Sequence, residues 1–340
     1  MLRSSTGDLC DDHDLVLLDL DGVVYIGREA VPGAADALDE ARRRGTRLAF
    51  VTNNAARPPD DVARHLRSLG VVAKPTDVVT SAQAAARMVA ARLPTESRVL
   101  ALGGPGVARA LEDEGLVAVF AAEDQPAAVV TGYGPDLTWR QIMRAAVLIQ
   151  GGLPWVACNA DWTIPTDYGV GPGHGVLVEM FRSFTGVEPE IAGKPRRPLI
   201  DETIRRVEGE RPLMVGDRLD TDIEGALAAG IPSLLVLTGV TGLAELVAAP
   251  ESVRPTYLSS TLDGLMQTHP VPAREADGWR LAGWAAAVVD RQLVVRGEGS
   301  VDDWWRVVVT TAWSSLDASG AVADTTGLQP GLPTGEPEAR

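Results

Sequence analysis

Residues 15–22 read Leu15-Val16-Leu17-Leu18-Asp19-Leu20-Asp21-Gly22. A short, continuous apolar run of this kind is typical of a strand buried on both faces of a parallel sheet. A helical pattern over residues 34–44 follows, and residues 48–51 form the next apolar run. This order predicts a βαβ unit, in which both carboxylates stand at the carboxyl end of the first strand. Open α/β sheets bind their ligands at that edge.

The same alternation continues to about residue 268. Further apolar runs lie at 78–79, 99–102, 127–130, 155–157, 213–215 and 234–237, and helical patterns lie at 59–69, 82–92, 106–114, 138–150 and 221–229. Repeated βα units with continuous apolar strands predict an α/β fold, with parallel sheets covered by helices.

The last 72 residues follow a different pattern. Residues 279–289, a turn at 290–291 and residues 292–296 predict a β-hairpin, and a helix with an apolar stripe is expected from Ser300. Five of the eight tryptophans lie between residues 279 and 313, which indicates a packed extension. Beyond residue 320 we expect a disordered tail, because Gly, Pro, Thr and Ala dominate.

Length, charge and cysteine content limit the class of protein. A chain of 340 residues is expected to form two to three domains, at about 150 residues each. The net charge of −15 argues against nucleic acid or anionic lipid as a partner. Two cysteines, Cys10 and Cys158, favour a reducing compartment. Since no signal peptide or long apolar segment is present, we expect a soluble, cytoplasmic protein without a membrane partner.

Acidic side chains follow two of the predicted strands. Asp19 and Asp21 follow the first, and Asp217, Asp220 and Asp222 follow the strand near residue 214. Carboxylates at one sheet edge repel one another unless a cation or a proton lies between them. The pattern does not fit an EF-hand loop, and a shared Mg²⁺ site fits better. The alternative is a pair of strand ends that happen to be acidic.

Two further motifs offer groups that bind phosphate. Val51-Thr52-Asn53-Asn54 places a hydroxyl and two amides at a strand end, although an Asx turn is the common reason for such a sequence. Gly193-Lys194-Pro195 offers a cation before a helix, with an ordinary surface lysine as the alternative. It is not a P-loop, because Glu188 and Pro195 stand where that motif needs Gly and Ser or Thr.

The remaining motifs give weaker indications of a functional site. Gly103-Gly104-Pro105-Gly106 precedes a helix like a dinucleotide loop, but Arg109 replaces its third glycine. The four histidines lack the spacing of zinc ligands. Residues 159–175, with Asp161, Tyr168 and His174, form either a substrate-facing loop or an ordinary connection.

Taken together, the four motifs at Asp19, Thr52, Lys194 and Asp217 resemble those of the haloacid dehalogenase-like (HAD) hydrolase superfamily. They look specifically like its NagD-like branch (class IIA), the p-nitrophenylphosphatase and phosphoglycolate phosphatase group. Residues 80–82 and 170–175 also resemble that branch, and the similarity covers roughly residues 15–265.

The resemblance implies a Rossmann-like parallel-sheet core with a large inserted α/β cap. We predict core residues 1–82 and 186–268, a cap over 83–185, a hairpin and helix extension over 269–320, and a tail over 321–340. A similar extension occurs in some actinobacterial relatives that act on glycerol 3-phosphate. For the extension we favour a structural or dimer-forming role over a fragment of an acetyltransferase-like module, so a homodimer is possible.

The resemblance also implies a role for each motif. Asp19 would be the nucleophile that forms an aspartyl-phosphate, and Asp21 the general acid and base. Mg²⁺ would be held by Asp19, the Asp21 carbonyl and Asp217, with Asp222 supporting the site. The phosphoryl group would be bound by Thr52, Asn53, Asn54 and Lys194.

The expected function is therefore a Mg²⁺-dependent phosphatase of a small phosphorylated metabolite, either glycerol 3-phosphate or 2-phosphoglycolate. The alternatives are a nucleotide or pyridoxal phosphate phosphatase and a non-catalytic phosphoryl-sensing module. The long insertion between Asn53 and Lys194 argues against a receiver-like sensing module.

Overall fold

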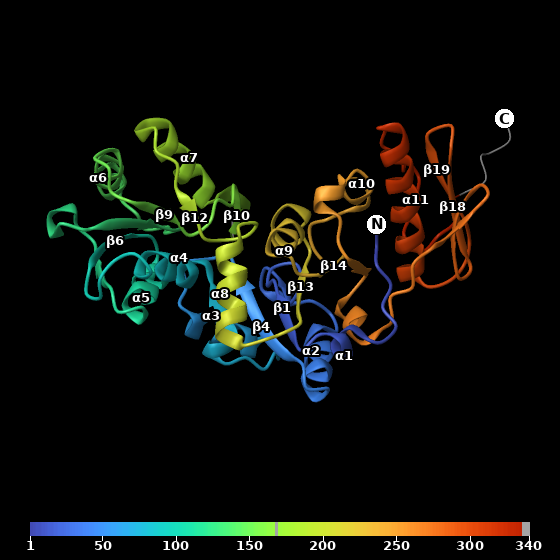
Figure 1. Ribbon diagram of the computed structural model, residues 1–340, viewed down its shortest axis with the longest axis horizontal. Helices are drawn as coiled ribbons and strands as arrows, with labels where there is room; N and C mark the ends of the chain where they lie inside the picture. The colour runs from blue at the N-terminus through green and yellow to red at the C-terminus, as the bar shows by residue number, and fades with distance from the viewer. Residues whose placement is uncertain (167–168, 335–340) are drawn as a thin grey trace. The chain divides into compact units, whose positions relative to one another are not determined.

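The computed structural model describes residues 1–166 and 169–334, and the contacts within it divide the chain into two units (Figure 1). The first unit comprises Met1–Arg47 and Glu210–Arg340, and the second comprises Leu48–Gly209. These bounds differ from the predicted core and cap boundaries because α4 (Ser81–Ala90) packs against α5 (Pro105–Asp113) and α8 (Arg197–Val207). The predicted boundaries of core, cap and extension stay a prediction.

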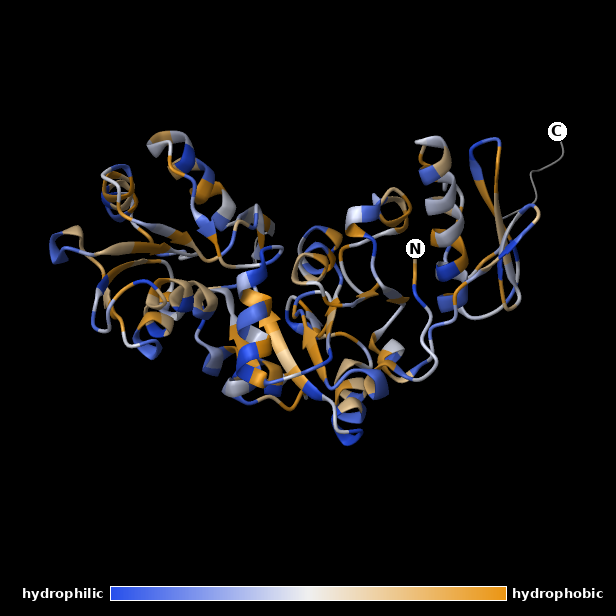
Figure 2. Cartoon of the chain, in the orientation of Figure 1, coloured by the Kyte–Doolittle hydropathy of each residue, from blue (hydrophilic) through white to orange (hydrophobic). Residues whose placement is uncertain are grey.

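A parallel sheet forms the centre of the first unit. Its strands lie in the order β15 (Tyr257–Ser259), β14 (Ser233–Val236), β13 (Pro212–Gly216), β1 (Leu15–Leu18). Every residue of β1 and β14 is buried, and β1 and β13 are coloured as hydrophobic in Figure 2. The predicted α/β class is confirmed, because continuous apolar strands of this kind are covered on both faces.

Short elements surround this sheet. They are α1 (Leu9–Asp12), β2 (Tyr25–Ile26), β3 (Glu29–Ala30), α2 (Ala34–Arg43), the turns Leu219–Ile223, Glu251–Val253 and Leu262–Met266, α9 (Glu224–Ala229) and α10 (Leu243–Val247). β2 and β3 pair antiparallel, directly after the first acidic motif.

The second unit contains two sets of parallel strands. β4 (Arg47–Thr52) pairs with β5 (Val78–Thr80), and a five-stranded sheet has the order β12 (Glu190–Ile191), β9 (Trp155–Ala157), β8 (Ala128–Thr131), β6 (Arg98–Leu102), β7 (Val117–Val119). The remaining elements are α3 (Pro59–Ser68), η1 (Pro75–Asp77), η2 (Ala122–Asp124), α6 (Trp139–Gln150), β10 (Thr163–Thr166), β11 (Gly169–Pro172) and α7 (His174–Thr185).

Local sequence sets several helix starts in this unit. Thr80 and Thr138 each accept a hydrogen bond from the main chain of a Gln three residues on, and that Gln bonds back to the main chain of the Thr. Such capping boxes satisfy N–H groups that a helix start leaves unpaired. The observed starts therefore lie within one residue of those predicted.

The C-terminal extension has more strands than the predicted hairpin. β16 (Ala273–Glu275), β17 (Gly278–Leu281), β18 (Trp284–Val289) and β19 (Gln292–Gly297) form an antiparallel sheet beside α11 (Val301–Ser319), as Figure 1 shows. The single strand expected over 279–289 is wrong. Ala282 adopts a φ of 48°, and a Cβ on Gly283 would lie 2.0 Å from the Glu298 oxygen, so the chain turns there.

Helix α11 begins as predicted and is buried against the rest of its unit. Ser300 accepts a hydrogen bond from the Asp303 main chain, and Trp304 and Trp313 are fully buried. They share one core with Leu246 of α10 and Leu258 of β15. The extension therefore completes the core of the first unit.

Part of the expected disordered tail is in fact ordered. Asp324 pairs with Gln292, the Thr334 main chain donates to the Val295 carbonyl, and the Trp304 indole donates to the Leu332 carbonyl. The remaining residues of that prediction, 335–340, lie outside the described residues. None of the described helices has the length and hydropathy that crossing a bilayer requires.

Candidate active site

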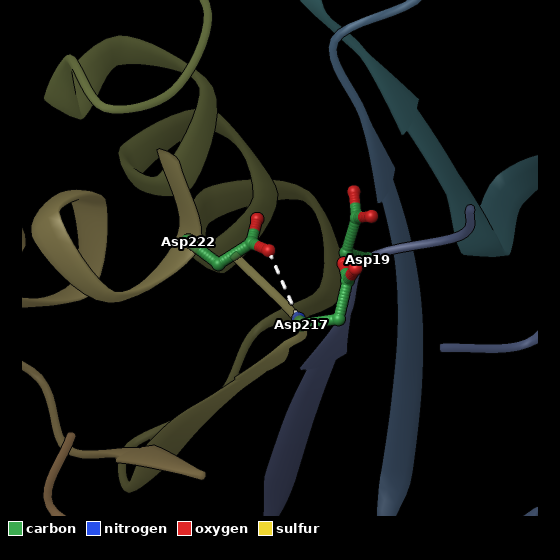
Figure 3. Close-up of side chains that lie close together, drawn as sticks. All are labelled: Asp19, Asp217 and Asp222. Atoms are coloured by element: carbon green, nitrogen blue, oxygen red, sulfur yellow. Dashed lines mark hydrogen bonds between the residues drawn. The ribbon is translucent and has the colours of Figure 1, made fainter. Parts of the chain in front are cut away.

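Three carboxylates from two neighbouring strand ends gather in the first unit (Figure 3). Asp19 follows β1 and Asp217 follows β13, and Leu18 is paired with Val215 in the sheet. With Asp222, from the turn Leu219–Ile223, they place one oxygen each within 4.8 Å of one another. The predicted meeting of Asp19, Asp217 and Asp222 is thus present in the structure.

Main-chain N–H groups hold the two buried members of this acid cluster. Asp222 Oδ2 accepts from the N–H of Asp217 at 3.2 Å and of Arg218 at 3.1 Å. Asp217 Oδ2 accepts from the N–H of Val240 at 2.7 Å. Asp217 and Asp222 are both fully buried, and N–H donors of this kind stabilise a buried carboxylate.

Two glycines make room for Asp217. A Cβ on Gly22, whose φ is +92°, would lie 2.3 Å from Asp217 Oδ2, and one on Gly239 would lie 2.0 Å from the same oxygen. No side chain fits at these distances. The loop after Asp21 and the loop that supplies Val240 therefore both depend on glycine to approach the carboxylate.

The acid cluster fits a divalent metal ion. Carboxylate oxygens are hard ligands, which Mg²⁺ and Ca²⁺ prefer. Three anionic groups this close, two of them without solvent exposure, are unfavourable unless a cation offsets their repulsion.

Asp21 has surroundings that suit proton transfer. Loss of water around its carboxyl group raises its pKa, and a hydrogen bond from the Gly27 main chain opposes that shift. A carboxyl group with a raised pKa is a better general acid near neutral pH. Since Gly27 lies between β2 and β3, this short hairpin sets the environment of the carboxyl group.

Asn53 and Lys194 meet in the second unit. The Lys194 main-chain N–H donates to Asn53 Oδ1 at 2.9 Å, and Asn53 Nδ2 donates to the Lys194 carbonyl at 3.0 Å. A second hydrogen of Nδ2 goes to Asp161 Oδ1 at 2.9 Å. Lys194 is only 3% exposed, so the surface-lysine alternative is wrong.

Thr52 and Asn54 form a turn around Asn53. The Thr52 hydroxyl accepts from the Asn54 main-chain N–H at 3.1 Å, and Asn54 Oδ1 accepts from the Ala56 main-chain N–H at 2.9 Å. The Asx turn considered for this sequence is therefore present at Asn54. A hydroxyl that accepts a hydrogen bond in this way still has its own hydrogen to donate.

The comparisons with known proteins agree with these motifs. A family model described as haloacid dehalogenase-like hydrolase matches residues 16–117, and a HAD-hydrolase-like model matches residues 191–265. D-Glycerol 3-phosphate phosphatase of Mycobacterium tuberculosis is 43% identical over 295 residues, which cover 87% of this chain and 82% of the relative. The chain belongs to the haloacid dehalogenase-like hydrolase family.

Other relatives place this HAD hydrolase among phosphatases. Acid sugar phosphatase of Staphylococcus saprophyticus is 33% identical over 258 residues, covering 75% of this chain and 98% of the relative. A crystal structure of a glycerol phosphate phosphatase of M. tuberculosis in complex with magnesium has a TM-score of 0.83 at 40% identity, covering 91% of this chain and 93% of that one. The chain is a phosphoric monoester hydrolase, and the non-catalytic sensing module is excluded.

Sequence reasoning missed the partners of Asn53 in this HAD hydrolase. Asn159 Nδ2 and the Ser81 hydroxyl both donate to the Asn53 carbonyl, and Asp161 bonds to its side chain. Asn159 and Asp161 follow β9 closely, so the strand-end rule that found Asp19 could have found them as well. Residues 159–175 also include Tyr168, which lies outside the described residues.

The glycines of residues 103–106 serve packing in this hydrolase. A Cβ on Gly106 would lie 2.4 Å from the Ala55 carbonyl oxygen, and the Gly106 N–H donates to the Ala56 carbonyl at 2.9 Å. The Gly104 N–H donates to the Tyr133 carbonyl. These N–H groups are used within the fold, which argues against a dinucleotide loop.

His174 predicts a pH dependence of stability. Burial lowers its pKa to about 4, while its Nδ1 lies 2.8 Å from the Asn159 carbonyl oxygen and is assigned as the donor. Above pH 6.5 the imidazole is neutral in the folded and unfolded states, so its contribution to the free energy of unfolding is at its full value. As the pH falls from 6.5 to 4 only the unfolded chain takes up the proton, and the free energy of unfolding falls by about 2 kcal/mol at pH 5.

Urea unfolding at pH 7.5 and pH 5.0 measures this change. His174→Asn keeps a donor for the Asn159 carbonyl and removes the titrating ring. Its stability should fall less between the two pH values than that of the parent chain. An equal fall in both proteins would contradict the assignment to His174.

Proposed function

We propose that this HAD hydrolase is a Mg²⁺-dependent phosphatase of glycerol 3-phosphate. The proposed substrate rests on how much of this chain is similar to the glycerol phosphate phosphatase. The glycerol phosphate phosphatase structure matches 91% of this chain, which is more than residues 1–268 contain. The similarity therefore extends into the C-terminal extension. Acid sugar phosphatase matches 98% of its own length to only 75% of this chain.

We propose that Asp19, the Asp21 carbonyl and Asp217 hold the metal ion, supported by Asp222. A bound Mg²⁺ would offset the charge of the phosphoryl group and of Asp19, which otherwise repel each other. The structure of the glycerol phosphate phosphatase with magnesium, and a second one with calcium, support a divalent ion.

In the proposed two-step reaction Asp19 is the nucleophile and then the leaving group, and Asp21 is the general acid and then the general base. An Asp19 oxygen attacks phosphorus and forms an aspartyl-phosphate, while the bond from phosphorus to the glycerol oxygen breaks. Asp21 donates its proton to that oxygen. Asp21 then takes a proton from a water molecule, which attacks the same phosphorus and releases phosphate together with free Asp19. The place of Asp21, two residues beyond Asp19 at the same strand end, supports its part as the acid.

Four residues are proposed to bind the phosphoryl group. Thr52, Asn53, Asn54 and Lys194 would contact its oxygens, with the Lys194 ammonium offsetting their charge. For Thr52, support comes from the hydroxyl hydrogen that its turn leaves available. For Asn53 the contact would come from the main chain, since its side chain already donates both amide hydrogens. For Asn54 it would come from the side-chain amide, since its main-chain N–H donates to the Thr52 hydroxyl and its Oδ1 accepts from Ala56.

A panel of phosphomonoesters tests the substrate and the metal together. With Mg²⁺ present, we expect glycerol 3-phosphate to give a higher kcat/KM than 2-phosphoglycolate, pyridoxal phosphate and a nucleoside monophosphate. Removal of divalent ions with EDTA should abolish phosphate release, and excess Mg²⁺ should restore it. A higher kcat/KM for one of the other substrates would overturn the proposed substrate, and full activity in EDTA would overturn the metal.

The possible homodimer and the cytoplasmic location stay predictions. The mass of the full chain in solution, measured by light scattering, tests the first. A single protomer mass at micromolar concentration would contradict it.

A further inference from the structure

Both N–H groups of the Asn53 side chain are engaged in hydrogen bonds within the fold. A carboxamide offers two N–H groups, and here one goes to the Lys194 carbonyl and one to Asp161 Oδ1. Its oxygen accepts from the Lys194 main-chain N–H. Asn53 therefore pairs with the Lys194 main chain through both an N–H and a C=O, as a neighbouring strand would.

This pairing occurs where regular structure is absent. Lys194 lies between β12 and α8, outside any helix or strand. The fit is close, since a Cβ on Gly193 would lie 2.7 Å from Asn53 Oδ1. The position of the Lys194 main chain, from which its side chain starts, thus depends on where the Asn53 carboxamide is held.

Asp161 is itself well anchored. Its N–H donates to Asn159 Oδ1 at 3.2 Å, and its carbonyl accepts from the Gly175 N–H at 2.8 Å. A Cβ on Gly173 would lie 2.3 Å from the Asp161 carbonyl oxygen, so the start of α7 packs directly on this segment. The carboxylate is therefore a fixed acceptor for the Asn53 amide, and a charged acceptor binds an N–H more strongly than a neutral one.

We propose that Asp161 is a positioning residue of this phosphatase, which acts through Asn53 to set the place of Lys194. The inference rests on the proposed function, in which the Lys194 ammonium offsets the charge of the phosphoryl group. Asp161 itself touches no reacting atom in this scheme. Its carboxylate fixes the carboxamide, the carboxamide fixes the main chain of Lys194, and the ammonium is placed as a result.

Kinetics of the full-length chain with p-nitrophenyl phosphate and with glycerol 3-phosphate test this proposal. Asp161→Ala leaves an amide hydrogen of Asn53 without its acceptor and should lower kcat/KM roughly ten- to a hundredfold. Asp161→Asn retains an oxygen acceptor, so kcat/KM should stay within about threefold of the parent value. Asp136→Ala, which removes an exposed carboxylate of the same unit, is the matched control.

Coupling between the two residues gives a second test. Because Asp161 acts through Asn53, adding Asp161→Ala to Asn53→Ala should cost less than about twofold more. A reversed pair offers rescue: Asn53→Asp should be poorly active, and adding Asp161→Asn should restore part of the activity by supplying an amide donor at position 161.

Hydrogen exchange at Lys194 reports on the same contact without turnover. Its main-chain N–H should exchange faster in Asp161→Ala than in the parent chain, and at the parent rate in Asp161→Asn. If Asp161→Ala does not fold, the double variant Asn53→Asp with Asp161→Asn provides the test. Its recovery of activity requires a direct contact between positions 53 and 161.

Three results would overturn the inference: Asp161→Ala behaving like Asp136→Ala, Asp161→Asn as damaging as Asp161→Ala, or full additivity with Asn53→Ala. Failure of the proposed substrate is separate, because it would appear as slow turnover of glycerol 3-phosphate by the parent chain. The kinetics with p-nitrophenyl phosphate and the hydrogen exchange at Lys194 would still test the role of Asp161.

Discussion

Replacing Asp19 with asparagine is expected to lower phosphatase activity by at least roughly 10⁴-fold. The change preserves the shape of the side chain but removes the charged oxygen that attacks phosphorus in the proposed reaction. It also removes one of the three negative charges of the acid cluster. The loss in kcat is measured as phosphate release from glycerol 3-phosphate at saturating Mg²⁺. A parallel assay uses p-nitrophenyl phosphate as the substrate.

The same variant should not lose stability when divalent ions are absent. Asp19 lies beside two fully buried carboxylates, so neutralising it relieves repulsion. We expect its Tm in EDTA to equal or exceed that of the parent chain, and its Tm to rise less when Mg²⁺ is added. A large fall of Tm in EDTA would show that lost activity reflects unfolding.

Asp220 offers a matched control for Asp19. It lies in the turn Leu219–Ile223, which supplies Asp222 of the acid cluster, but its side chain is exposed and pairs with Arg218. Asp220→Asn should therefore change kcat by less than about twofold. If Asp19→Asn retained turnover close to that of Asp220→Asn, the nucleophile would have to be another group.

Sequence alone was enough to find the acid cluster, because a general rule of parallel sheets connects its members. Asp19 and Asp217 each follow a continuous apolar strand, and parallel strands bring their carboxyl ends to one edge. The role of the Asn53 side chain could not be predicted in this way. No general rule connects Asn53 with Asp161 and Lys194, and an amide can hold a main chain as well as a phosphate.

Some elements were missed because their sequences carry weak signals. The helix α7 begins directly after a glycine-rich stretch, which predicts a loop when it is considered alone. The break between β17 and β18 depends on Ala282 in a left-handed conformation, for which alanine gives no signal. In both places tertiary packing decides the structure.

Replacing Trp313 with alanine is expected to lower the free energy of unfolding of the first unit by about 3–5 kcal/mol. The side chain is fully buried in the core that joins α11 to α10 and β15. Its indole N–H donates to the Leu246 carbonyl at 2.8 Å. The Arg254 guanidinium lies 5.1 Å from the centroid of its ring and also bonds to both oxygens of Asp317.

Two further variants separate the causes of this loss. Trp139, whose side chain is 62% exposed, gives the matched control, and Trp139→Ala should change stability by less than about 0.5 kcal/mol. Trp313→Phe keeps much of the ring volume but removes the indole donor to the Leu246 carbonyl, which still accepts from the Ala249 main-chain N–H, and should cost about 1–3 kcal/mol.

The measurement is urea unfolding followed by circular dichroism, and it decides what the extension does. If the extension completes the core, Trp313→Ala will destabilise the chain, and removal of residues 270–340 will expose Leu246 and Leu258 and prevent stable folding. If the extension were only a surface for a second copy, Trp313→Ala would instead leave the unfolding midpoint near that of Trp139→Ala. The burial of Trp313 within its own unit favours the first outcome, so we expect the phosphatase to require residues 270–340 for stability.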